Sequence, residues 1–176
     1  MPELIPWFER VFTFDAPDGI FPNVLERLRG TPTRLEERLR PLPLHLLTRK
    51  EAGAWSIMEN AGHLLDLEPL WAARVEDFVR GNERLKIADL TNRKTHEAGH
   101  NTSPLERILS SFRSARSELV RKLEDLDGAA FSKTALHPRL NTPMRLLDHV
   151  FFVAEHDDHH LARISCLVRS FASSGP

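Results

Sequence analysis

The chain has 176 residues, of which 41% are hydrophobic, and 24 lysines and arginines stand against 25 aspartates and glutamates. This length and composition predict one soluble domain, residues 1–176, with a core that needs no covalent crosslinks. The near-neutral charge, the lack of an 18-residue apolar run and an N-terminus unlike a signal peptide predict a cytoplasmic protein without nucleic-acid or membrane partners.

The first part of the chain predicts an arm, a helix and a loop. Residues 1–18 are rich in aromatic side chains and are interrupted by prolines, which is typical of a packed arm or a short helix. A helix is predicted over residues 22–39, with a kink or a break at Gly30 and Pro32. Residues 40–54 contain two more prolines and are predicted to form a loop.

The second helix has clear signals at both ends. Ser56 and Glu59 form a capping box at its start, and Gly81 is the expected C-cap. The polar segment 82–102 that follows shows no apolar period, so it predicts a long crossover loop that can cover a functional site.

The third and fourth helices complete the pattern. Ser103, Pro104 and Glu106 indicate a second capping box at the start of the third helix, which should stop before Gly128. Residues 128–141 predict a loop, and the fourth helix is expected from Thr142 to about Phe171. Strand signals are nearly absent, so the predicted fold class is all-α, a four-helix bundle with a long crossover connection.

The predicted fourth helix holds three histidines within five residues. At about 100° per residue, His156 and His160 face the apolar stripe, whereas His159 points toward solvent or stands behind the other two. His149 also faces inward and is a reserve candidate. On the second helix, His63 borders the apolar stripe as His156 does on its own helix.

These positions predict a metal site. Neutral imidazole is the commonest metal ligand among side chains, and three imidazoles buried without partners would be unfavourable. We therefore expect His63, His156 and His160 to bind one cation. The alternative is that each is a hydrogen-bonded histidine of an ordinary core.

Two motifs resemble those of a known family. The segment Trp55-Ser-Ile-Met-Glu-Asn-Ala-Gly-His63-Leu-Leu-Asp66 resembles the first motif of the DinB-like (YfiT-like) proteins, and His156-Asp-Asp-His-His160-Leu-Ala-Arg-Ile resembles the second. The segments that begin at Gly30 and at His137 are also similar to recurring segments of that family. The resemblance extends from about residue 21 to residue 164.

The resemblance implies more than the spacing does. It implies an up-down-down-up helix order, and a divalent cation, usually zinc or nickel, held by His63, His156 and His160. It also implies a homodimer and, among characterised relatives, enzymes that use a low-molecular-weight thiol.

Three functions remain open. In the first, the protein is a thiol S-transferase in which the metal ionises a thiol that attacks an electrophile. In the second, it is a hydrolase that activates a metal-bound water, with Glu59 or Asp66 as general base. In the third, it only binds metal or dimerises.

The remaining candidates have interpretations that favour structure over chemistry. Asp157 falls inside an apolar stripe, so we expect it to hold a ligand histidine or a helix-one arginine, or to form a purely structural ion pair. His96 and His100 are interpreted as solvated loop residues, and Cys166 as a buried, unreactive thiol. The three tryptophans (Trp7, Trp55 and Trp71) are expected in the core or in an interface rather than around a substrate.

Overall fold

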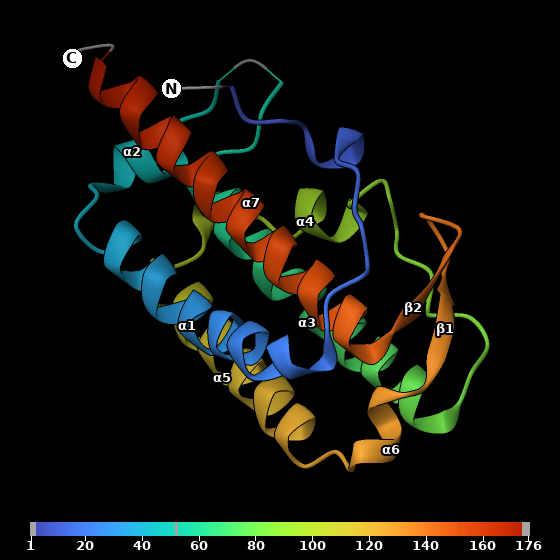
Figure 1. Ribbon diagram of the computed structural model, residues 1–176. Coiled ribbons are helices and arrows are strands. Elements are labelled where there is room, and N and C mark those ends of the chain that lie inside the picture. The colour runs from blue at the N-terminus through green and yellow to red at the C-terminus, as the bar shows by residue number, and fades with distance from the viewer. Residues whose placement is uncertain (1–2, 52, 174–176) are drawn as a thin grey trace.

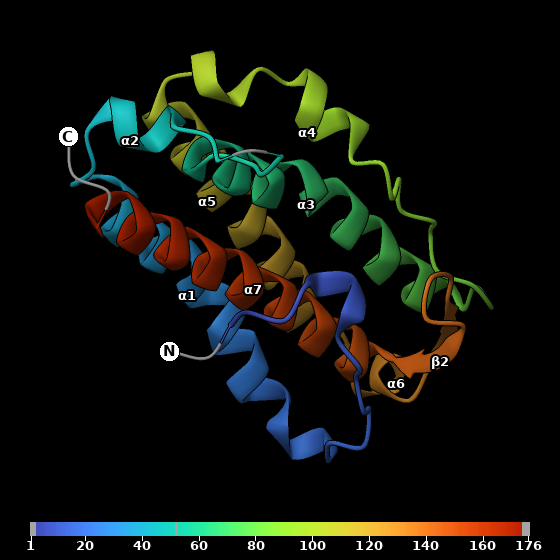
Figure 2. The same ribbon diagram turned by 90° about the horizontal axis from the view of Figure 1, so that it is seen from above.

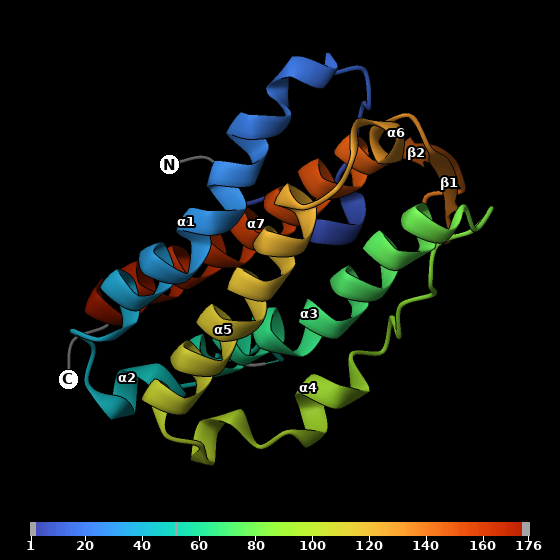
Figure 3. The same ribbon diagram turned by 90° about the horizontal axis from the view of Figure 1, so that it is seen from below.

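Four long helices form the body of the computed structural model, which describes residues 3–51 and 53–173 (Figure 1). They are α1 (Phe21–Leu39), α3 (Ile57–Arg80), α5 (Leu105–Glu124) and α7 (Leu146–Ser173). Helices α1 and α7 run in one direction, and α3 and α5 run in the other (Figure 3). The predicted four-helix bundle and its up-down-down-up order are therefore confirmed.

The connections contain short elements of their own. These are the 3-10 turns η1 (Trp7–Glu9), η2 (Asp18–Ile20) and η3 (His100–Thr102), the helices α2 (Leu44–Thr48), α4 (Arg93–Glu97) and α6 (Gly128–Phe131), and the strands β1 (Thr134–His137) and β2 (Thr142–Arg145). After α3, the chain runs back along that helix through α4 and η3 before α5 begins (Figure 2). This crossover makes α3 and α5 parallel neighbours.

The ends of α3 agree with the prediction. The Ser56 hydroxyl accepts a hydrogen bond from the Glu59 backbone N–H at 3.1 Å, and the Glu59 carboxylate accepts one from the Ser56 N–H at 2.8 Å. Gly81 closes the helix in the left-handed conformation, with φ at 72°, which glycine adopts without a steric penalty.

The start of α5 differs from the prediction. Pro104 is the N-cap and has an extended backbone conformation, so the helix begins one residue later than expected and has no side-chain cap. The Glu106 carboxylate instead accepts two hydrogen bonds at 3.1 Å from Arg40 at the end of α1. The predicted capping box is wrong because this tertiary contact takes the carboxylate away.

The start of α7 is also later than predicted. Residues 142–145 form β2, which pairs antiparallel with β1 from the segment that was predicted to be a loop. Asn141 adopts a positive φ of 50° in the turn between the strands. Helix α7 then begins where the Asp148 carboxylate accepts the Arg145 backbone N–H at 2.9 Å.

Helix α1 continues through Gly30 and Pro32 without the predicted break. Pro32 has no N–H, so it leaves the Leu28 carbonyl without its helical partner. The guanidinium of Arg116, on α5, donates to that carbonyl at 3.4 Å. A buried side chain from another helix thus replaces the missing hydrogen bond.

The same arginine joins all four long helices. Arg116 is 1% exposed and pairs with Glu68 of α3 at 2.5 Å and with Asp157 of α7. Asp157 also accepts a hydrogen bond from Thr31 of α1 at 2.9 Å. Asp157 therefore forms a structural ion pair with an α5 arginine, and the predicted contacts with a ligand histidine or a helix-one arginine are wrong.

The N-terminal arm packs on α7, in agreement with the predicted packed arm. Its η1 turn places the Trp7 ring 5.1 Å from the Phe152 ring, and Phe12 lies 5.2 Å from the same ring. In the part of the chain that the structure describes, no helix combines the length and the apolar character needed to cross a membrane.

Candidate metal centre

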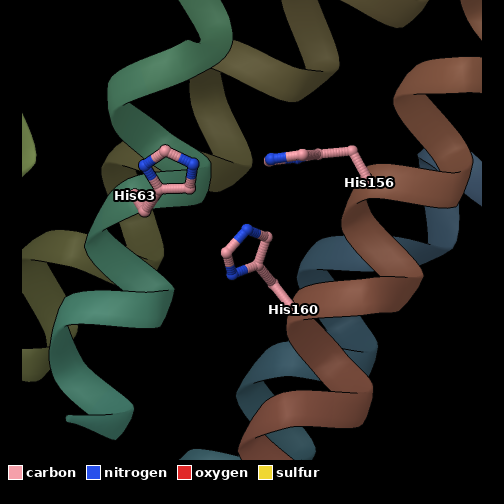
Figure 4. A group of neighbouring side chains, drawn as sticks. All are labelled: His63, His156 and His160. Carbon is pink, nitrogen blue, oxygen red and sulfur yellow. The ribbon is translucent and has the colours of Figure 1, made fainter. Parts of the chain in front are cut away.

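Three imidazole rings converge between α3 and α7 (Figure 4). His63 comes from α3, and His156 and His160 come from successive turns of α7. One ring nitrogen of each lies within 4.8 Å of the others, and the three side chains are almost fully buried. The structure thus brings together the three histidines that the sequence singled out.

Hydrogen bonds fix the outer nitrogen of His63. Its Nδ1 lies 3.0 Å from the Thr95 hydroxyl, and that hydroxyl donates to the Asp66 carboxylate at 2.9 Å. Because the hydroxyl proton goes to Asp66, the Nδ1–H of His63 must donate to the hydroxyl oxygen. The Nε2 of His63 is then an acceptor without a proton, as a metal ligand must be.

His160 has the same arrangement with a different partner. Its Nδ1 lies 2.9 Å from the Asn60 side-chain oxygen, and the Asn60 amide nitrogen donates to the Ser56 carbonyl at 2.8 Å. The amide orientation therefore requires His160 to donate from Nδ1, which again leaves Nε2 unprotonated. Asn60 was not predicted, although a polar residue on the buried face three positions before His63 was a usable signal.

The protonation of the cluster also suits a cation. Burial lowers the pKa of His63 to about 4, and burial together with the neighbouring histidines lowers the pKa of His156 and His160 well below the usual value. The Nδ1 of His156 is buried without a hydrogen-bond partner. Three neutral imidazoles at this spacing fit a borderline divalent cation such as zinc or nickel.

Asp66 lies behind His63 and not in the cavity. It accepts hydrogen bonds from Thr95 and from the Nε2 of His100 at 2.8 Å, and its side chain is 5% exposed. His100 is therefore buried, and its interpretation as a solvated loop residue is wrong. A Cβ on Gly62 would lie 2.3 Å from the His100 ring, so the glycine lets the crossover approach α3.

The predicted general bases are thus occupied elsewhere. Glu59 is held by the helix cap and by an ion pair with Lys50 at 2.7 Å, and it does not line the cavity. Asp66 accepts hydrogen bonds from Thr95, which contacts His63, and from His100. Neither carboxylate is among the residues that line the cavity, so the structure does not support either one as the general base.

A cavity of about 620 Å³ opens beside the three histidines. Among the residues that line it are Trp7, Trp55, Trp71, Phe152, His96, His159, Arg74, Arg84, Arg139, Arg163 and Asp89. The three tryptophans line this cavity, and Trp71 is at the same time 3% exposed within the hydrophobic core, as predicted. The crossover contributes part of the wall, as the length of the loop suggested.

The other histidines have separate positions. His159 is not turned to solvent, because its ring packs 5.6 Å from Trp7 at the cavity wall. His96 is exposed, as predicted, and its ring lies 5.6 Å from Trp55. His149 is fully buried between Trp71 and Phe78, outside the cluster of three.

The comparisons with known proteins agree on the fold. The model of the DinB superfamily matches residues 27–164. The structure resembles YfiT from Bacillus subtilis, described as a probable metal-dependent hydrolase with an unusual four-helix bundle topology, with a TM-score of 0.81 and 16% identity over 93% of this chain and 94% of that one.

A second solved structure is similar over a shorter part of its length. It is a mycothiol-dependent maleylpyruvate isomerase, with a TM-score of 0.66 and 12% identity over 86% of this chain and 62% of that one. This chain thus spans less than two thirds of the isomerase. At these identities both likenesses concern the fold, and no curated protein gave a significant match to the sequence.

Proposed function

Because the chain belongs to the DinB superfamily, and because three neutral imidazoles meet at the wall of its cavity, we propose that it is a metal-dependent enzyme. His63, His156 and His160 are the proposed ligands of a divalent cation, zinc or nickel. The observation that carries the proposal is the pair of outer hydrogen bonds, to Thr95 and Asn60, that leave the Nε2 atoms of His63 and His160 unprotonated. Three protein ligands leave coordination positions for a substrate.

We favour thiol S-transfer as the reaction. When bound, the cation would lower the pKa of a coordinated thiol or water, and either would then be a nucleophile near neutral pH. The sulfur of the thiolate would form a bond to an electrophilic carbon, whose leaving group departs with the bonding electron pair. The mycothiol dependence of one structural neighbour supports a thiol as the nucleophile.

The charge of the cavity wall favours an anionic nucleophile or an anionic substrate. Four arginines line it (Arg74, Arg84, Arg139 and Arg163), and Asp89 is the one acidic residue among its described lining. This positive environment stabilises an anionic nucleophile or substrate. A hydrolase would also benefit from a carboxylate base, which the predicted residues do not provide here.

Hydrolysis is the alternative that a specific observation supports. YfiT, with a similar fold over nearly the whole chain, is described as a probable metal-dependent hydrolase. A purely metal-binding role is less favoured, because the histidines face an open cavity of substrate size and not a closed site.

Parallel assays separate these functions. Untagged, metal-loaded protein is incubated with glutathione, cysteine, mycothiol or bacillithiol and monochlorobimane, and separately with a panel of esters and amides. We expect thiol conjugation that falls by at least about a hundredfold in His63→Ala and is unchanged in His45→Ala, an exposed histidine of α2. Hydrolysis without conjugation supports the hydrolase. Equal activity of His63→Ala and His45→Ala contradicts both the transferase and the hydrolase.

A further inference from the structure

A second group of polar side chains lies in the same cavity, apart from the three histidines. Arg74 of α3 is 2% exposed, and its guanidinium donates to the Lys86 carbonyl at 2.9 Å and to the Nε2 of His137 at 3.0 Å. Arg139 extends from the turn between β1 and β2, and its Nη2 is buried without a hydrogen-bond partner. Within the described residues, neither arginine forms an ion pair.

This group has more hydrogen-bond donors than acceptors. The ring of His137 receives the N–H of Arg74 at Nε2 and the backbone N–H of Leu140 at Nδ1. A neutral imidazole has only one acceptor nitrogen, so it cannot satisfy both donors. Burial and the two arginines lower the pKa of His137 to about 3, and burial lowers the pKa of Arg74 to about 10. An uncompensated guanidinium in such a place is unfavourable unless an anion joins it.

Aromatic rings connect this group to the three histidines. The Trp71 ring lies 5.5 Å from the Arg74 guanidinium and 5.5 Å from the His156 ring. The Trp7 ring likewise lies 5.8 Å from Arg139 and 5.0 Å from His156. The same two aromatic rings therefore lie next to both the donor group and the histidines.

We infer that Arg74 and Arg139, beside His137, form a subsite for the oxyanion of a substrate, a carboxylate or a phosphate. The apolar part of that substrate packs against Trp7 and Trp71, and its reactive end reaches the three histidines. The guanidinium groups match both oxyanions because each presents paired N–H donors. The inference rests on the proposed function, since it names the substrate class of the same cavity.

Binding to full-length protein tests the subsite by calorimetry with 3-phenylpropionate, 2-phenylethyl phosphate and the neutral 3-phenylpropanamide. The measurements use metal-loaded protein and protein treated with a chelator. We expect at least one anion to bind about tenfold or more tightly than the amide in both forms, and the tighter anion identifies the group. Equal binding of anions and amide overturns the inference, and so does anion binding that requires the metal.

Two matched variants locate the anion. Arg139→Gln should weaken binding of the anion about tenfold and leave binding of the amide unchanged, and it avoids removing the fully buried Arg74. Arg121→Gln removes the same charge from the exposed surface of α5, outside the cavity, and it should change anion binding little. Equal losses in the two variants would mean that the anion responds only to the overall charge, which contradicts the subsite. Because the chelated protein is measured as well, the anion subsite can be contradicted while the proposed metal site is supported. The metal site can likewise be contradicted while the anion subsite is supported.

Discussion

At the scale of single residues, the chemistry depends on side chains that hold the three histidines. Thr95 and Asn60 fix the Nδ1 protons of His63 and His160, and Asp66 in turn accepts from Thr95. Helical spacing was enough to select the histidines, because their direction follows from the period of the helix. Thr95 could not be found in this way, because it lies in a crossover whose path depends on tertiary packing.

The role of Thr95 predicts a loss of metal affinity in Thr95→Val. Valine keeps the shape of the side chain but removes the hydroxyl between His63 and Asp66, so the Nδ1 proton loses its acceptor. We expect metal affinity to fall by about 10–100-fold, measured by competition with a chromogenic chelator. Thr102→Val, in the exposed η3 turn of the same crossover, is the control and should bind metal normally. Equal affinity in both variants would show that the hydroxyl does not orient His63.

At the scale of elements, the buried ion cluster sets how the helices meet. Arg116 contacts Leu28 of α1, Glu68 of α3 and Asp157 of α7, and Asp157 is the residue next to His156. The helices themselves could be predicted from the apolar period and from the cap of α3. The hairpin before α7 and the start of α5 could not, because strand pairing and the contact between Glu106 and Arg40 form only in the folded protein.

This cluster predicts a large loss of stability in Arg116→Met. The substitution leaves Glu68 and Asp157 buried without a counter-charge, and we expect the free energy of unfolding in urea to fall by about 3–5 kcal/mol. Adding Glu68→Gln and Asp157→Asn should recover part of that loss.

The matched control is Arg113→Met on the same helix. Arg113 is half exposed and pairs with Glu36, so its removal should cost less than about 1 kcal/mol. Similar losses for Arg113→Met and Arg116→Met would mean that burial of the cluster has no special effect on stability.

At the scale of the whole molecule, the bundle and the crossover enclose a cavity with a cluster of histidines, a group of arginines and aromatic walls. The family resemblance predicted the order of the helices, and the apolar periodicity predicted the four-helix bundle. The cavity could not be foreseen, because its walls combine the N-terminal arm, the crossover and the hairpin. Dimerisation stays a prediction, which sedimentation equilibrium of untagged protein would check.

Burial of neutral histidines predicts that the metal-free protein loses stability in weak acid. In the unfolded chain a histidine takes up a proton near pH 6.5, whereas His63 does so at about pH 4 in the folded protein. The unfolded state therefore binds more protons between these pH values, and stability falls as the pH falls through this window. His63 alone contributes about 1.4 kcal/mol per pH unit.

Urea unfolding of chelated protein at pH 7, 6 and 5 measures this dependence. His137, whose pKa is lowered to about 3, extends the loss to lower pH. A free energy of unfolding that is constant or rises between pH 7 and pH 5 would contradict neutral burial of these side chains.

The metal content of untagged protein tests the central claim most directly. Elemental analysis after loading with zinc or nickel and desalting should find close to one ion per chain in the wild-type protein and in His45→Ala. His63→Ala, His156→Ala and His160→Ala should each retain less than about a tenth of that amount while circular dichroism shows an intact helical fold. Full metal content in all three folded variants, or none in the wild-type protein, would contradict a metal centre at these histidines.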